Sequence, residues 1–269
     1  MTLEKLRLDD RIAVVTGGGT GLGKAMALAM AEAGADIVLA ARRPEPIEDV
    51  IKQVEALGRR GLAIKTDVTD SEQVDSMVQQ VIQKFGKIDI LLNNAGGGGA
   101  GRGKSLFELT DDDWRVGIDT NLTGAFYCIR AVGPYMVSQR AGVIINVASG
   151  HGMRGAPNSF MYNSAKAGTI TFTKSLALTL VDDNIRVNCI VPGFVSQTDP
   201  ETEEDWDLLR QKGRFVPVRR IGFASELGPL AVFLASDASS YVTGQSICID
   251  GGGMVDGLGP VQLVPVVTL

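Results

Sequence analysis

Ser149, Tyr162 and Lys166 are the residues of this 269-residue chain whose types and spacing best suit proton transfer. Tyr162 and Lys166 are four positions apart, and residues at i and i+4 share one face of a helix. The Lys166 ammonium would favour the phenolate of Tyr162, so that this side chain could give or take a proton. Ser149, at the end of a preceding strand, could hydrogen-bond the oxygen that receives the proton. The alternative is an exposed helical pair, because this spacing arises by chance in many helices.

A glycine-rich turn near the N-terminus is the second stretch of the sequence that suggests a function. It follows the β-branched run at residues 11–16 and precedes a helical pattern at residues 24–34. Glycines let a backbone approach a pyrophosphate, and the start of a helix offers amides and a positive dipole. The alternative is a turn without a ligand. The residues expected to bind a dinucleotide cofactor here are Gly17, Gly19, Thr20, Gly21, Leu22 and Gly23.

The end of the second expected strand indicates which dinucleotide is preferred. A site for NAD favours a carboxylate at this point, but Ala41 stands there and is followed by Arg42 and Arg43. A guanidinium suits a 2′-phosphate through charge-assisted hydrogen bonds. We therefore expect NADP(H) to be preferred, with NAD(H) as the alternative. The two arginines could instead be solvated side chains at the entry to a helix.

Apolar strands alternate with helices along the whole chain, which indicates an α/β fold with a parallel sheet covered on both faces. The expected strands lie at residues 11–16, 36–41, 62–66, 88–92, 142–147, 185–191 and 246–250. The expected helices lie at residues 24–34, 44–57, 71–85, 111–138, 158–180 and 224–235, the fourth bent or interrupted around Gly124 and Gly133-Pro134.

Residues 1–269 are expected to form a single domain, since no linker or repeat divides them. The long irregular segment at residues 192–221 contains the acidic run 198–205. This run could begin a solvated helix, or the segment could be a mobile lid over a substrate. The apolar tail at residues 259–269 contains two prolines, which argue against a helix. We expect it to pack against a neighbouring subunit, the alternative being its own subunit.

Composition excludes several classes of function. The net charge is −5 without a basic block, which argues against nucleic acid as a partner. The widely spaced Cys128, Cys189 and Cys248 are interpreted as buried thiols in a reducing compartment. A single histidine and no Cys/His cluster argue against a metal site. No apolar run reaches membrane-spanning length, and the charged first ten residues lack a signal region, so we expect a cytoplasmic protein.

Several short motifs together resemble the classical short-chain dehydrogenase/reductase family, over roughly residues 10–253. Their order and spacing match Thr16-Gly17-x-x-x-Gly21-x-Gly23, Asn94-Ala95-Gly96, Asn121, Ser149, Tyr162-x-x-x-Lys166 and Pro192-Gly193. The resemblance implies a single-domain, Rossmann-like, doubly wound parallel sheet of about seven strands, and a homotetramer or homodimer. It also implies a small-molecule carbonyl or alcohol substrate.

The resemblance assigns roles to individual residues. Tyr162 would be the general acid/base, assisted by Lys166, which would also bind the nicotinamide ribose, and Ser149 would orient the substrate oxygen. Asn121 would hold a water linked to Lys166, or it could only satisfy a bend in its helix. The remaining cofactor contacts would come from Asp67 (alternatively a turn residue), Val68, Asn94, Ala95, Gly96, Pro192 and Gly193.

The sequence departs from the family pattern at two places. Gln197 stands where a threonine is common after Pro192-Gly193, so the Val195 backbone is the safer contact for the nicotinamide amide. Residues 96–104 are rich in glycine, and Arg102 and Lys104 there could meet an anionic substrate or be solvated. His151 and Met153 are expected to line the substrate pocket with Ser149 and Tyr162.

We therefore expect an NADP(H)-preferring oxidoreductase that interconverts a ketone and a secondary alcohol. One alternative is an NAD-dependent alcohol dehydrogenase of the same family. Another is a cofactor-binding scaffold without turnover, although such a protein has no physical reason to keep Asn121, Ser149, Tyr162 and Lys166 at working spacing.

Overall fold

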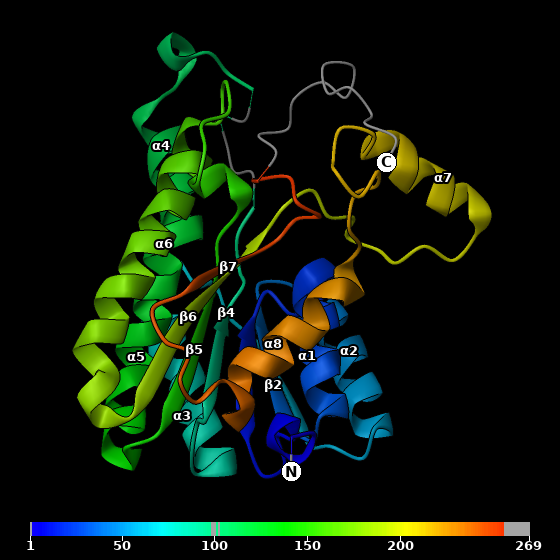
Figure 1. The fold of residues 1–269 in the computed structure, drawn as a ribbon. Coiled ribbons are helices and arrows are strands. Elements are labelled where there is room, and N and C mark those ends of the chain that lie inside the picture. The colour runs from blue at the N-terminus through cyan, green and yellow to red at the C-terminus, as the bar shows by residue number, and fades with distance from the viewer. Residues whose placement is uncertain (1, 98–100, 102, 256–269) are drawn as a thin grey trace.

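The structure is a computed structural model and describes residues 2–97, 101 and 103–255. A parallel sheet of seven strands forms its centre, with strand order β3-β2-β1-β4-β5-β6-β7 (Figure 1). The strands are β1 (Ile12–Thr16), β2 (Asp36–Ala41), β3 (Gly61–Lys65), β4 (Ile90–Asn93), β5 (Gly142–Val147), β6 (Ile185–Pro192) and β7 (Ser246–Ile249). The expected doubly wound α/β fold is therefore confirmed.

Helices cover both faces of this sheet (Figure 1). The helices are α1 (Gly21–Glu32), α2 (Pro44–Ala56), α3 (Ser71–Phe85), α4 (Asp111–Ile118), α5 (Gly124–Gln139), α6 (Phe160–Leu180), α7 (Glu203–Lys212) and α8 (Gly228–Ala235). One hydrophobic cluster joins the sheet to α1, α2 and α8, and another joins it to α3, α5 and α6.

Strand β1 shows why the sequences of the strands are continuous apolar runs. All five of its residues are buried. Ala13 and Val15 belong to the cluster with α1, whereas Ile12 and Val14 belong to the cluster on the opposite face. Successive side chains of a strand point to opposite faces, so a strand covered on both sides needs apolar residues at every position.

The helix expected at residues 111–138 is divided in the structure. It consists of α4, a π-helical segment at Asp119–Thr123, and α5. The interruption falls just before Gly124, as expected, but α5 continues through Pro134. A π-helical turn inserts one residue into a helix and is common at functional sites. Here it contains Asn121.

The segment at residues 192–221 is not irregular throughout, because it contains α7. Thr202 caps this helix by accepting a hydrogen bond from the Asp205 amide, and the Asp205 side chain accepts one from the Thr202 amide. The acidic run is therefore the start of a helix, where carboxylates interact favourably with the helix dipole. Its proposed action as a lid stays a prediction.

The expectation that all three cysteine thiols are buried is wrong for Cys248. Cys128 and Cys189 are buried, but Cys248 is exposed on β7, which is the last strand at its edge of the sheet. Among the described residues, no helix is long and apolar enough to cross a membrane. The tail at residues 259–269, and Arg102, lie outside the described residues.

Candidate active site

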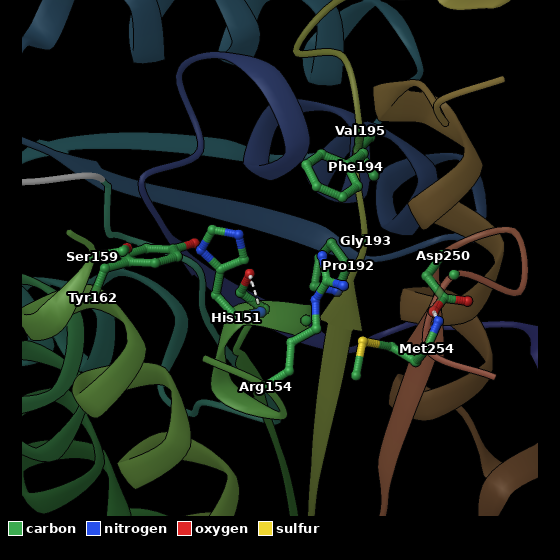
Figure 2. A pocket seen from close by; sticks show the side chains of 13 residues that line it. His151, Arg154, Ser159, Tyr162, Pro192, Gly193, Phe194, Val195, Asp250 and Met254 are labelled. Atoms are coloured by element: carbon green, nitrogen blue, oxygen red, sulfur yellow. Dashed lines mark hydrogen bonds between the residues drawn. The ribbon is translucent and has the colours of Figure 1, made fainter. Parts of the chain in front are cut away.

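Three cavities follow the edge of the sheet where the strands end. The first cavity, of ≈550 Å³, lies at the ends of β1, β2 and β3. The central cavity, of ≈280 Å³, lies at the ends of β1, β4 and β5. The outer cavity, of ≈290 Å³, lies at the ends of β5, β6 and β7 (Figure 2). In open α/β sheets, ligands bind at this edge, where neighbouring strands lead into helices on opposite faces.

Shared residues join the three cavities into one path. Gly17, Thr20, Ala95 and Gly96 line both the first and the central cavity. The residues common to the central and outer cavities are Ser149, Tyr162, Pro192, Gly193 and Val195. A long ligand could therefore extend through the first two cavities and present one end to a second molecule in the third. Ser149 and Tyr162 lie where the two would meet.

The glycine turn after β1 is shaped for close approach. Gly17 has φ +66° and Gly21 has φ +56°, in the left-handed region that favours glycine. A side chain at Gly17 would come within 2.9 Å of the Ala95 Cα atom. Asn94 fixes the turn by donating from Nδ2 to the carbonyls of Thr16 and Gly17, both at 3.1 Å.

The start of α1 is suited to an anion. Its N-cap residue, Thr20, makes no side-chain capping bond in the described structure. The amides of the first helical turn are therefore left for a ligand, and the helix dipole favours a negative charge there. Gln197 lies against this turn, since a Cβ atom at Gly21 would be 2.0 Å from its Oε1 atom. The residue that departs from the family pattern thus lines the central cavity.

Val195 lines both the central and the outer cavity. The neighbouring peptide groups bond to Gly222, with the Gly222 amide donating to the Phe194 carbonyl at 2.9 Å and the Ser196 amide donating to the Gly222 carbonyl at 2.8 Å. Successive peptide groups of an extended chain point in opposite directions, so the N–H and C=O of Val195 point away from Gly222. This arrangement agrees with the expected backbone contact.

Arg42, Arg43, Asp67 and Val68 line the first cavity. Both arginines are exposed, so they can reorient toward a phosphate at low cost. Asp67 also has a local role, because its Oδ1 atom accepts hydrogen bonds from the amide and hydroxyl of Thr69 at 3.0 and 2.8 Å. It is therefore a turn residue that also faces the cavity, and both interpretations of Asp67 have structural support.

Ser149, Tyr162 and Lys166 come together from β5 and α6. Ser149 follows β5, and its hydroxyl accepts a hydrogen bond from the His151 amide at 3.2 Å, which orients it. Tyr162 and Lys166 lie in the first two turns of α6. The Lys166 Nζ atom is 5.7 Å from the centre of the Tyr162 ring. The spacing of four residues therefore places both groups on one face, as expected.

Lys166 is only 4% exposed, which is unusual for a charged side chain. Its ammonium donates to the Val147 carbonyl at 2.9 Å. Burial lowers the pKa of Lys166 from 10.5 to about 8, because desolvation disfavours the charged form. Gly96 makes room for this group, since a Cβ atom there would lie 3.2 Å from Nζ and 2.7 Å from the Oδ1 atom of Asn121.

Asn121 connects the loop after β4 to the π-helical segment. Its Nδ2 atom donates to the carbonyls of Gly97 and Gly117 at 2.9 and 3.0 Å, and its Oδ1 atom accepts from the Gly97 amide at 3.0 Å. The bond to Gly117 satisfies a carbonyl at the helix interruption, which supports the structural interpretation. Asn121 also lies beside Lys166 across Gly96, and its expected link to Lys166 through water stays a prediction.

The substrate side differs in part from the expectation. His151 lines the outer cavity, and its ring meets the Tyr162 ring edge-on at 5.9 Å between centroids. The expectation for Met153 is wrong for this cavity: Met153 is exposed, lies outside the lining, and has its sulfur 3.4 Å from the Cys248 sulfur. The lining residues that the sequence did not indicate are Gly150, Arg154, Ser159, Phe194, Asp250, Gly253 and Met254.

Two comparisons of sequence place the chain among known proteins. A family model described as enoyl-(acyl carrier protein) reductase matches residues 17–253. The chain is 39% identical over 248 residues to the 3-oxoacyl-acyl-carrier-protein reductase FabG of Thermotoga maritima, covering 92% of this chain and 99% of that protein. It is 37% identical to the 3-oxoacyl-acyl-carrier-protein reductase of Synechocystis, covering 91% and 97%.

Solved structures agree with these relatives. A short-chain type dehydrogenase/reductase from Mycobacterium marinum superposes with a TM-score of 0.83 at 35% identity, covering 94% of this chain and 98% of that one. A 7α-hydroxysteroid dehydrogenase complexed with NADH and 7-oxo glycochenodeoxycholic acid gives 0.83 at 32% identity, covering 93% and 96%. Fold and site together define an oxidoreductase built on a doubly wound sheet. The chain belongs to the short-chain dehydrogenase/reductase family.

The buried Lys166 predicts a specific dependence of stability on pH. Its pKa of about 8 in the folded protein is below the 10.5 of an unfolded lysine, so the folded state binds fewer protons between these values. The contribution of Lys166 to the free energy of unfolding therefore rises as the pH increases from about 8 to 10.5. The free energy of unfolding of the wild type, relative to Lys166→Met, should increase by about 2 kcal/mol between about pH 7 and pH 10.

Urea unfolding at both pH values measures this difference. Lys174→Met, an exposed lysine of the same helix, is the matched control and should show no such change. Parallel pH profiles for the wild type and Lys166→Met would contradict the lowered pKa.

Proposed function

We propose that the protein interconverts a ketone and a secondary alcohol, with NADP(H) as the preferred cofactor and NAD(H) as the alternative. The observation that carries the proposal is the position of Tyr162 and Ser149 in the wall shared by the central and outer cavities. A proton donor at this junction can act on a substrate in the outer cavity while a cofactor is held in the other two.

The chain's own residues fit a dinucleotide along the first and central cavities. The start of α1 and the glycine turn would hold the pyrophosphate, and Gly17 and Gly21 keep that approach free of side chains. Arg42 and Arg43 would bind the 2′-phosphate, and Asp67 and Val68 would line the adenine. Toward the other end, Lys166 would bind the nicotinamide ribose, and the backbone of Val195 would contact the amide.

Proton transfer is the part of the reaction that the protein performs. When bound, the nicotinamide supplies or accepts the hydride. In the direction of reduction, the Tyr162 hydroxyl gives its proton to the carbonyl oxygen, and the Ser149 hydroxyl holds that oxygen by a hydrogen bond. The buried Lys166 ammonium places a positive charge 5.7 Å from the centre of the Tyr162 ring.

The named relatives support a carbonyl as the reacting group. Those from Thermotoga maritima and Synechocystis are 3-oxoacyl reductases, whereas the family model carries the description of an enoyl reductase. A proton donor and a second hydroxyl in the wall of the same cavity suit a ketone better than a carbon–carbon double bond. The NAD-dependent alternative is favoured by one observation, the NADH bound to the similar 7α-hydroxysteroid dehydrogenase.

Replacing Tyr162 by phenylalanine tests the proton donor. Tyr162→Phe keeps the ring and removes the hydroxyl, so ketone reduction should fall by at least about a hundredfold while the affinity for NADPH stays similar. Nicotinamide absorbance measures turnover, and fluorescence titration measures cofactor binding. Tyr241→Phe, at an exposed tyrosine, is the matched control. Near-normal turnover of Tyr162→Phe would rule out its assigned role.

Replacing Arg42 by alanine tests the choice of cofactor. Losing a charge-assisted contact to phosphate costs about 1.5–3 kcal/mol, so Arg42→Ala should weaken NADPH binding by roughly tenfold or more and spare NADH. Titrating both cofactors into Arg42→Ala, and into Arg7→Ala as a surface control, measures the effect. An equal loss for both cofactors, or a wild type that prefers NADH, would argue for the NAD-dependent alternative.

We also propose that the protein is a homo-oligomer, a tetramer or a dimer. The support is a set of large apolar side chains on α4 and α5, where Trp114, Val116 and Phe126 are 45%, 47% and 43% exposed. An interface between subunits would cover large apolar side chains that are exposed in this way. Light scattering should give a mass of at least twice 28.5 kDa. A monomeric mass at micromolar concentration would contradict the proposal.

A further inference from the structure

Arg154 brings a positive charge into the outer cavity. It lies in the loop that joins Ser149 to α6, and it lines the same cavity as Ser149 and Tyr162. Figure 2 shows its side chain extending into the cavity from this loop. The residue is half-buried, so its guanidinium loses part of its contact with water. Removing a charged group from water is costly unless another polar or charged group interacts with it.

No described residue supplies that partner. Arg154 takes part in none of the ion pairs or side-chain hydrogen bonds found among residues 2–97, 101 and 103–255. The carboxylate in the same lining, Asp250, bonds to its own turn and not to Arg154: its Oδ1 and Oδ2 atoms accept from the amides of Gly252 and Met254 at 3.0 and 2.7 Å. The guanidinium therefore keeps its hydrogen-bonding capacity for a ligand.

The phosphates of a dinucleotide are not that ligand. Arg154 lines neither the first cavity, which holds Arg42 and Arg43, nor the central cavity, which holds the start of α1. It lies in the outer cavity, on the substrate side of Tyr162. An anion bound there belongs to the molecule whose carbonyl reaches Ser149 and Tyr162.

The rest of the outer cavity suits a small molecule with one charged end. Phe194 and Met254 provide apolar wall, Ser159 adds a hydroxyl, and the volume is ≈290 Å³. Ligand sites are mainly apolar, with a few placed polar groups that fix orientation. Two such anchors are present here. One is the pair of hydroxyls of Ser149 and Tyr162, and the other is the Arg154 guanidinium.

We propose that Arg154 binds an oxyanion of the substrate, so that the protein reduces ketones that carry a carboxylate or a phosphate. The inference rests on the proposed function, since the carbonyl is oriented between Tyr162 and Ser149. Arg154 is then the residue that determines specificity, because a guanidinium forms paired, charge-assisted hydrogen bonds with an oxyanion. A neutral ester or thioester at the same position gains much less from it.

The experiment compares acids with their neutral counterparts. The substrates are the oxo acids 3-oxobutanoate, 4-oxopentanoate and 5-oxohexanoate, which place the carboxylate at increasing distance from the carbonyl, and the methyl ester of each. Dihydroxyacetone phosphate and dihydroxyacetone form the phosphate pair. In the wild type, kcat/KM should favour at least one anion over its neutral counterpart by roughly tenfold or more. The acid and phosphate pairs tell the two oxyanions apart.

Variants assign this preference to Arg154. Arg154→Met should abolish the ratio between anion and neutral counterpart, whereas Arg154→Lys, which keeps the charge but loses the paired geometry, should retain part of it. Arg7→Met, at an exposed arginine that lines none of the three cavities, should keep the wild-type ratio. A wild type without preference for any anion, or an Arg154→Met variant with the wild-type ratio, overturns the proposal.

A binding measurement separates this inference from the proposed reaction. Calorimetric titration of the same oxo acids and of dihydroxyacetone phosphate uses protein saturated with NADP⁺, which cannot deliver a hydride to a ketone. The preferred anion should bind Arg154→Met at least roughly tenfold more weakly than the wild type. If no ketone is reduced but this difference appears, the proposed reaction fails and anion binding at Arg154 stands. Equal affinities overturn the inference even if ketones are reduced.

Discussion

The burial of a single ammonium, that of Lys166, is the constraint on which the site depends. A charge in the interior is costly unless polar groups surround it, and desolvation lowers the pKa of this one to about 8. The carbonyl of Val147 meets it from the end of β5. Gly96, at the end of β4, has no side chain and so lets the ammonium and Asn121 approach each other. Two strands, α6 and the π-helical segment must all be in place to accommodate one cation.

The order of the strands explains why the chemistry lies where it does. Neighbouring strands β1 and β4 lead into segments on opposite faces, which opens the central cavity between the glycine turn and the loop after β4. The ends of β5 and β6 then separate this cavity from the outer one and supply Ser149 and Pro192 to the wall that both share. The Tyr162 hydroxyl, the proposed proton donor, is thus placed at the boundary between two cavities with different linings.

Local patterns could predict the fold and the residues around Lys166, because the signals are short in range. The spacing of Tyr162 and Lys166 is a property of one helix, and the glycine turn is a property of one strand–helix connection. Met153 and Cys248 could not be placed from local sequence, since their exposure depends on how a loop meets an edge strand nearly a hundred residues away. Arg154 could not be predicted for the same reason. It lines a cavity whose opposite wall is the turn after β7, about a hundred residues later in the chain.

That closing turn has an evolutionary consequence. Asp250 holds it with two backbone hydrogen bonds, and Gly251 and Gly252 supply its left-handed backbone, at φ +62° and +86°. Gly253 and Met254 face the outer cavity from the last part of the chain that the structure describes, whereas the glycine turn and Lys166 lie in earlier segments. Mutations that remodel the wall at Met254 would leave the glycine turn and Lys166 unchanged. Substitutions in this wall can therefore change which substrates fit, and each intermediate variant during evolution would keep its activity.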